Sequence, residues 1–83
     1  MRNQYDAESL QELIADFPDF PKTGIIFRDV SPLLNDPRAL TAAAELMAEP
    51  FCDMEVTHVA GIESRGFIFG PLIAERLNAG LCL

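Results

Sequence analysis

The sequence is poor in cysteine, histidine and basic residues, and these shortages exclude several classes of protein. Its 83 residues include two cysteines and one histidine, too few for a disulfide framework and without a spacing that fits a zinc site. Six Lys and Arg residues are outnumbered by thirteen Asp and Glu, giving a net charge of -7. A compact nucleic-acid-binding domain usually has a basic face, so this charge balance argues against nucleic acid as a partner.

Long apolar runs are also missing, which argues against a membrane protein. The longest apolar stretches, such as residues 67–74, are far shorter than the ~20 residues that a helix needs to cross a bilayer. The N-terminus has no apolar segment of the kind that a secretory signal contains. We therefore expect a cytoplasmic protein that binds neither a membrane nor nucleic acid.

The composition is that of an ordinary globular domain at about half the usual length. Hydrophobic residues make up 49% of the chain and charged residues 23%, shares typical of soluble folded proteins. A typical domain has roughly 150 residues, and a chain this short buries a small share of its surface. We therefore expect a thin core and a chain that is part of something larger.

The first half of the chain is predicted to contain two helices and a short strand. Apolar residues at a 3.6-residue spacing predict an amphipathic helix that ends at Phe17, with Asp6 or Ser9 as its N-cap. A loop with two prolines follows, and a short strand is expected over 25–27. An Asp-Pro start and a run of alanines predict a second helix over 36–49.

The second half is predicted to form a strand–helix–strand unit. A buried strand is expected over 56–62, then a helix that ends near Asn78 with Gly80 as the residue after its C-cap, and a further strand beginning at Leu81. Because a proline inside a helix removes one hydrogen bond, we expect either that Pro71 lies in the first turn of that helix or that the helix begins irregularly. This order implies a parallel sheet with a right-handed crossover. Because parallel strands are normally covered on both faces, we expect the sheet to be incomplete.

The loop over 61–66 is the first candidate for a ligand site, because ligands of α/β sheets bind beyond the carboxyl ends of the strands. Its two glycines would let the backbone approach a ligand closely. Arg65 offers a charged fork for phosphate and Ser64 a hydroxyl, and the backbone N–H groups after Arg65 would face an anion. The alternative is an ordinary turn in which Arg65 pairs with Glu63 or Glu75, and spacing alone favours neither.

Arg28 is the second candidate, because it follows an apolar triplet and precedes an acid. It would either line a pocket for a planar ligand or form a solvated pair with Asp29 worth well under ~1 kcal/mol. His58 is expected to be a core or edge residue, and Cys52 and Cys82 are expected to be buried thiols without a catalytic role.

Two sequence blocks together resemble the adenine phosphoribosyltransferase family. The first block reads FPDFP over 17–21 and GIIFRDVSPL over 24–33, and the second reads VAGIESRGFIFG over 59–70. Both occur in the order found in the family, and Pro71 also follows the second block there. The resemblance extends from the first helix to Leu83.

The resemblance implies an enzyme of purine salvage. The family transfers the 5-phosphoribosyl group of phosphoribosyl pyrophosphate to N9 of adenine, forming AMP and pyrophosphate, with Mg²⁺ carried by the phosphoribosyl pyrophosphate. The implied fold is the N-terminal part of a type I phosphoribosyltransferase, an incomplete α/β fold. Residues 1–34 would form a helix and a hood over the base, and residues 35–83 the first βαβ unit of a parallel sheet. Full-length members are usually homodimers.

The resemblance also implies roles for individual residues. Ile26 and Arg28 would bind adenine, Ile26 through its backbone, whereas Glu63, Ser64 and Arg65 would hold the pyrophosphate of phosphoribosyl pyrophosphate. The Glu63–Ser64 peptide bond would be cis. The catalytic acid, the flexible loop and the ribose 5-phosphate loop of the family lie beyond residue 83, so we expect no catalytic residue, no metal ligand and no activity in these 83 residues alone. The alternative is a non-catalytic regulator with the same fold that binds phosphoribosyl pyrophosphate.

Overall fold

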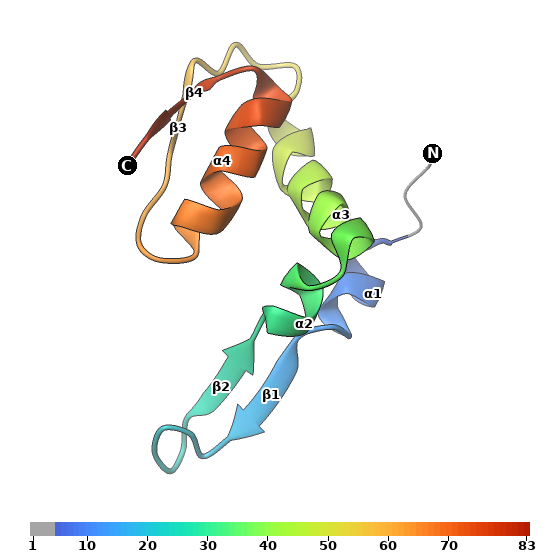
Figure 1. Ribbon diagram of the computed structural model, residues 1–83, viewed down its shortest axis with the longest axis vertical. Helices are drawn as coiled ribbons and strands as arrows, with labels where there is room; N and C mark the ends of the chain where they lie inside the picture. Colours follow the sequence, from blue (N-terminus) through green and yellow to red (C-terminus); the bar gives the residue numbers. More distant parts are fainter. Residues whose placement is uncertain (1–4) are drawn as a thin grey trace. The chain divides into compact units, whose positions relative to one another are not determined.

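The computed structural model describes residues 5–83, which divide into two compact units between Ala43 and Ala44. In chain order the elements are α1 (Ala7–Gln11), β1 (Ala15–Pro18), β2 (Ile26–Asp29), α2 (Ser31–Leu34), α3 (Pro37–Ala48), the 3-10 helix η1 (Glu49–Phe51), β3 (His58–Ala60), α4 (Gly66–Leu77) and β4 (Gly80–Cys82) (Figure 1). No helix among these residues is long and apolar enough to span a bilayer. The division between hood and core after residue 34 stays a prediction.

The first helix is shorter than predicted, because it ends at Gln11 and Phe17 lies in β1 instead. Its start was predicted correctly. The Asp6 carboxylate accepts the Ser9 backbone N–H at 2.8 Å, and the Ser9 hydroxyl oxygen accepts the Asp6 N–H at 2.9 Å, which is a capping box. The hydrogen bond from the Ser9 backbone N–H to the carboxylate lowers the pKa of Asp6, and the Ser9 side chain lowers it further. The helical spacing of the apolar residues wrongly predicted a helix at Phe17, because residues 15–18 pair with a second strand at residues 26–29 instead.

That partner is β2, and the two strands form an antiparallel hairpin in which Phe17 lies opposite Phe27. The strand β2 runs through Asp29, two residues beyond its predicted end, because the pairing with β1 continues to that point. In the connecting turn Asp19 and Gly24 both have positive φ, and the Asp19 carboxylate accepts the Gly24 N–H at 2.9 Å. Asn and Asp tolerate this backbone region better than other side chains, and glycine adopts it freely.

Helix α3 begins after Asp36 as predicted and ends at Ala48, where η1 follows. One carboxylate oxygen of Asp36 accepts the backbone N–H groups of Arg38 at 3.0 Å and Ala39 at 3.4 Å, and so caps the helix. The other oxygen accepts the Tyr5 hydroxyl at 2.7 Å. This hydrogen bond lowers the pKa of Asp36 and raises the pKa of Tyr5. A single carboxylate therefore ties residue 5 to the first turn of α3.

The core is thin, as expected, and its buried apolar residues are mostly alanines. They are Leu10, Leu33, Ala39, Ala42, Ala43, Ala44, Ala48 and Ala74. Within residues 5–83 no large side chain is fully buried. Because the stabilisation from burial scales with apolar area, an alanine core contributes less than one of leucine and phenylalanine.

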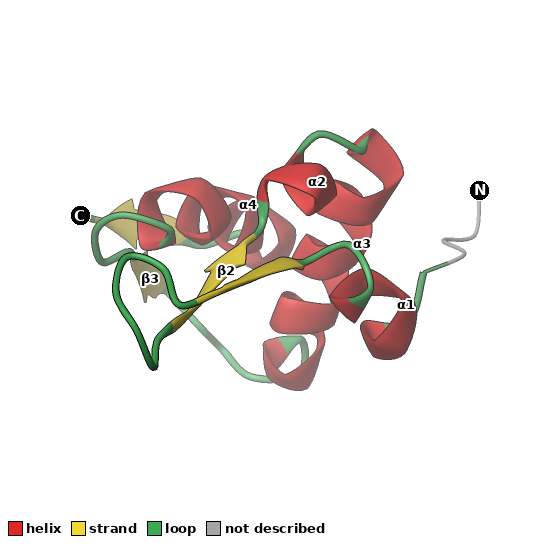
Figure 2. Ribbon diagram, turned by 90° about the horizontal axis from the view of Figure 1, so that it is seen from below, coloured by secondary structure: helices red, strands yellow, loops and turns green. Residues whose placement is uncertain are grey.

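The second unit contains the predicted βαβ arrangement, with β3 and β4 paired in parallel and α4 packed against both (Figure 1). Figure 2 shows α4 as a red helix and β3 in yellow, seen from below. Two details at α4 differ from expectation. The left-handed residue that ends the helix is Asn78, with φ of 55°, whereas Gly80 pairs with His58 in the sheet. Pro71 lies inside the helix, beyond its first turn, and the helix continues through it to Leu77. The alternative expectation, an irregular start, is confirmed, because the N–H groups of Phe67 and Ile68 donate to carbonyls three residues earlier in the chain.

The strand predicted to be buried is short and largely open to solvent. β3 covers three residues, of which Val59 alone is half-buried, and the following Ile62 is 79% exposed. Cys52 and Cys82 are also exposed, so their predicted burial is wrong. For β3 and Cys82 of β4, the physical reason is that two strands packed on one helix cannot enclose both of their faces, whereas Cys52 lies outside the sheet, after η1. These exposed side chains agree with the expectation of an incomplete sheet.

Candidate functional site

The loop of Ile62–Arg65 connects the end of the β3 segment to α4, as the sequence predicts for a ligand-binding βα loop. The two ends of this loop, Gly61 and Gly66, lie very close together, and we call this point the neck of the loop. A Cβ atom placed on Gly61 would lie 2.6 Å from the carbonyl oxygen of Gly66, and a Cβ on Gly66 would lie 3.1 Å from the carbonyl carbon of Gly61. The two backbones therefore lie in contact: a side chain at Gly61 does not fit without a shift of the backbone, and one at Gly66 requires a smaller displacement of its neighbour.

All three predicted pyrophosphate residues of this loop are exposed. The peptide bond between Glu63 and Ser64 is cis, as the family resemblance implies. Arg65 is the N-cap residue of α4, whereas Glu75 lies ten residues further along, about 15 Å by the rise of a helix. Glu75 is therefore too distant to be the ion partner of Arg65, and Glu63 remains as the alternative partner.

The helix start offers fewer anion-binding groups than predicted. The Phe67 N–H donates to the Ser64 carbonyl at 3.1 Å, and the N–H groups of Ile68 and Phe69 donate to the Arg65 carbonyl at 3.0 Å each. These three donors are used within the protein and do not face a ligand. An anion would therefore depend on the side chains and backbone of the loop rather than on the first turn of α4.

Arg28 lies in β2 of the first unit, beside an acid that the sequence did not point to. Its Nε atom lies 3.9 Å from Oδ1 of Asp16, the residue directly opposite in β1. The two side chains are 60% and 57% exposed, so this ion pair contributes little to stability. Asp29, the predicted partner, accepts hydrogen bonds from the Ser31 N–H at 3.0 Å and the Ser31 hydroxyl at 2.6 Å.

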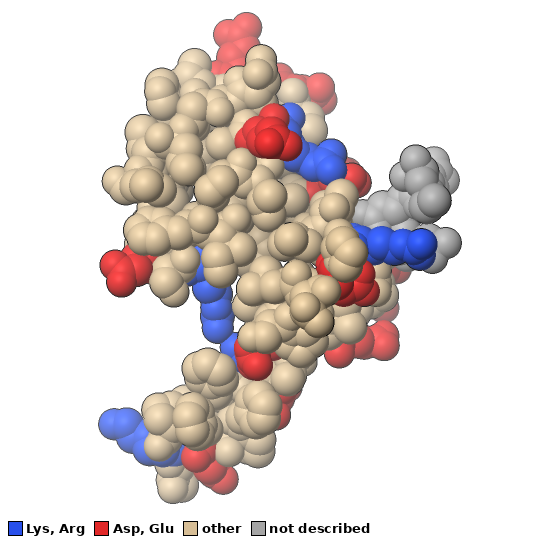
Figure 3. All heavy atoms as spheres, in the orientation of Figure 1, with Lys and Arg blue, Asp and Glu red and all other residues tan. Residues whose placement is uncertain are grey.

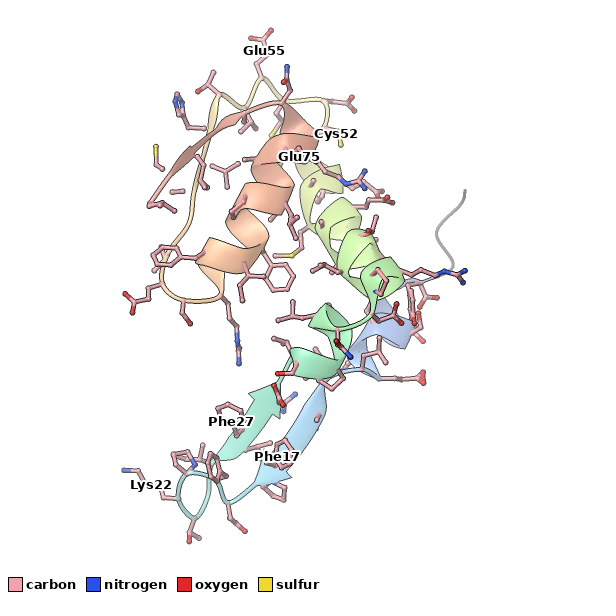
Figure 4. The ribbon with its side chains drawn as sticks, in the orientation of Figure 1. Phe17, Lys22, Phe27, Cys52, Glu55 and Glu75 are labelled. Carbon is pink, nitrogen blue, oxygen red and sulfur yellow. The ribbon has the colours of Figure 1, made fainter. Side chains whose placement is uncertain are left out.

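The hairpin around Arg28 leaves several large apolar side chains exposed. The Phe20 ring stands edge-on to the ring of Phe27, with centroids 5.6 Å apart. Phe17 and Phe27 extend from the two paired strands (Figure 4). Phe17 is 49% exposed and Ile26 is 53% exposed. Such apolar exposure on a polar protein is typical of a binding surface.

The face of the molecule shown in Figure 3 has no basic patch, because its Lys and Arg atoms, drawn in blue, occur in small separate groups.

In the second unit, Arg76 donates a hydrogen bond to Glu45 at 2.8 Å, beside a hollow of about 320 Å³ that Cys52 also lines. Among residues 5–83 there is no group of three or more His, Cys, Asp and Glu side chains that could hold a metal ion.

The structure therefore brings the predicted site residues together in two sets. Ile26 and Arg28 share one strand of the first unit, and Glu63, Ser64 and Arg65 share one loop of the second. The sequence did not reveal the contact of Gly61 with Gly66 or the position of Asp16. The one signal in the sequence was the presence of a glycine at each end of the loop.

No family model matches the chain. The chain is 53% identical over 79 residues to the adenine phosphoribosyltransferase of Rhodopirellula baltica. That alignment covers 95% of this chain but 38% of the relative.

Solved structures of adenine phosphoribosyltransferases also match the chain. The adenine phosphoribosyltransferase of Rhodothermus marinus matches with 49% identity and a TM-score of 0.79, over 89% of this chain and 42% of that one. The enzyme of Giardia lamblia, solved with 9-deazaadenine, matches with 40% identity and a TM-score of 0.84, over 94% and 43%. The chain thus spans about two fifths of the length of these relatives. The predicted family resemblance and partial α/β fold are confirmed, and the regulator alternative gains no support.

Proposed function

We propose that this chain is the base- and pyrophosphate-binding part of an adenine phosphoribosyltransferase. The complete protein would transfer the 5-phosphoribosyl group of phosphoribosyl pyrophosphate to N9 of adenine, giving AMP and pyrophosphate. The observation that carries the proposal is the 53% identity over 79 residues, a span that includes both the β1–β2 hairpin and the Ile62–Arg65 loop. The proposal includes a homodimer, as the resemblance implies, and the cytoplasmic location expected from the sequence.

The β1–β2 hairpin would bind adenine. Within the described residues β2 pairs with β1 alone, so its other edge leaves alternate backbone N–H and C=O groups for a further partner. The edge of adenine carries both donors and acceptors that fit such a strand edge. Ile26 would contribute backbone groups, and Arg28 would lie beside the base. The Giardia relative, solved with the adenine analogue 9-deazaadenine, supports a base site in this family.

The Ile62–Arg65 loop would hold the pyrophosphate group of the substrate, which is taken as the magnesium complex of phosphoribosyl pyrophosphate. The Arg65 guanidinium and the Ser64 hydroxyl can donate to phosphate oxygens. They would stabilise the negative charge that builds on pyrophosphate as its bond to the ribose breaks. Glu63 would contribute through its backbone, because its carboxylate repels an anion.

The direct test is an assay of the complete protein with adenine and magnesium phosphoribosyl pyrophosphate. We expect AMP and pyrophosphate in equal amounts, and no nucleotide when hypoxanthine replaces adenine. Binding of phosphoribosyl pyrophosphate without formation of any nucleotide would contradict the proposal and favour the non-catalytic regulator.

Replacement of Arg28 with alanine tests the adenine site. In the complete protein we expect Arg28→Ala to raise KM for adenine about tenfold, the effect of losing a contact worth about 1.4 kcal/mol. KM for phosphoribosyl pyrophosphate should stay within about twofold. Asp16→Ala is the matched control, because it removes the ion pair and leaves Arg28 in place. An equal rise in KM for adenine in both variants would assign the effect to the ion pair instead.

A further inference from the structure

We propose that Gly61 and Gly66 are positioning residues, whose direct backbone contact places Ser64 and Arg65 for binding of a pyrophosphate group. This inference rests on the proposed function and adds two residues to it. The chemistry recognised is that of an inorganic or ribose-linked diphosphate. Neither glycine touches the anion; both act through the loop that lies between them.

The need for glycine at these two positions is a need for space. Among the described glycines only Gly24 has a positive φ, so Gly61 and Gly66 are not required for a left-handed backbone. A Cβ on Gly61 would meet the Gly66 carbonyl oxygen at 2.6 Å and its carbonyl carbon at 3.2 Å. These obstacles are backbone atoms, which cannot rotate away as the end of a side chain can.

The neck is also anchored on both sides. The Gly61 N–H donates to the Cys82 carbonyl at 2.8 Å and so extends the parallel pairing of β3 with β4. On the other side, the Ser64 and Arg65 carbonyls accept N–H groups from the first turn of α4. Since Ser64 and Arg65 are hydrogen-bonded to the helix that begins at Gly66, a displacement of Gly66 away from Gly61 would move both residues with it.

The size of that displacement follows from the contact distance. Ordinary van der Waals contact begins near 3.4 Å, so a methyl group 2.6 Å from the Gly66 oxygen would force the backbones apart by about 0.8 Å. A misplacement of about 1 Å can reduce catalysis roughly 100-fold. The displacement would fall on Ser64 and Arg65 and leave the β1–β2 hairpin unchanged.

The experiment compares three alanine variants of the complete protein. Gly61→Ala meets the closest obstacle, at 2.6 Å, and Gly66→Ala the next, at 3.1 Å. Gly70→Ala is the matched control: its Cβ would meet the Leu81 Cδ1 atom at 3.3 Å and the Gly61 Cα at 3.5 Å, so the end of a movable side chain is its nearest neighbour. We expect KM for phosphoribosyl pyrophosphate to rise about tenfold or more in Gly61→Ala, less in Gly66→Ala, and under about twofold in Gly70→Ala.

Three further measurements separate positioning from loss of folding. KM for adenine should stay within about twofold in all three variants, because a general loss of structure would raise both KM values. Calorimetric titration with inorganic pyrophosphate should show weaker binding in the same order. Thermal melting identifies a variant that does not fold, and if Gly61→Ala fails to fold, the milder Gly66→Ala decides.

The outcomes also distinguish this inference from the proposed function. If the wild type forms no AMP but binds pyrophosphate, and the two neck variants weaken that binding, the proposed enzyme function fails and the positioning role stands. Unchanged KM for phosphoribosyl pyrophosphate and unchanged pyrophosphate affinity in folded neck variants would overturn the inference. A wild type that binds no pyrophosphate would overturn it as well.

Discussion

Replacing Arg65 with alanine in the complete protein is expected to lower kcat/KM for phosphoribosyl pyrophosphate by about 100-fold to 1000-fold, the usual effect of removing a donor aimed at developing negative charge. The folding stability should change by less than about 0.5 kcal/mol, as for most exposed positions. Arg65 is exposed, and its side chain does not cap α4. A large kinetic effect with little change in stability is the signature of a binding role.

The matched control for this variant is Arg76→Ala, which removes a positive charge from the other end of the same helix. Arg76 pairs with Glu45 at 2.8 Å, and both side chains are about two fifths exposed, at 41% and 40%, so its loss should cost at most about 1 kcal/mol. Its kcat/KM should match the wild type. If Arg65→Ala also keeps the wild-type kcat/KM, Arg65 is not a pyrophosphate ligand and its loop is an ordinary turn.

The 83-residue chain on its own is expected to form no detectable AMP under conditions in which the complete protein is fully active. The chain spans 38% of the Rhodopirellula relative, and the catalytic acid and the ribose 5-phosphate loop of the family are expected beyond residue 83. The exposed β3 and β4 also leave its sheet open. The measurement is the AMP assay with the purified chain, at a concentration about 100-fold above that of the complete protein.

Mixing provides the control for this second prediction. Adding the 83-residue chain to the complete protein should leave the rate of the complete protein unchanged, which excludes an inhibitor in the preparation. Formation of AMP by the chain alone would contradict the prediction and would require that all catalytic groups lie within residues 1–83.

Local signals in the sequence predicted the parts of the fold that depend on neighbouring residues. Asp36 before proline, followed by alanines, predicted α3, because a cap and helix-forming residues act within a turn or two. The capping role of Asp6 was predicted for the same reason. The β-branched strand before the loop predicted the βαβ unit, although β3 proved short and exposed.

The sequence-based predictions failed or were incomplete where the structure of a residue depends on partners outside its own turn of the chain. Phe17 continues the helical spacing of the residues before it, but its pairing with Phe27 places it in a strand. The ion pair of Arg28 with Asp16, the residue opposite in the hairpin, had no signal in the sequence. Cys52 is expected to be buried from its residue type, but a thin core of alanines leaves it exposed.

The sequence by itself determined the family resemblance and the helix starts that N-caps define, and it supplied the predicted residues of the candidate site, because each of these depends on residues that lie close together in the chain. Only the tertiary structure decided how the Ile62–Arg65 loop is held. Gly61 and Gly66 are separated by four residues, and a spacing cannot show that their backbones touch. That contact arises because β4 anchors one end of the loop and α4 the other, and both partners form only when the chain folds.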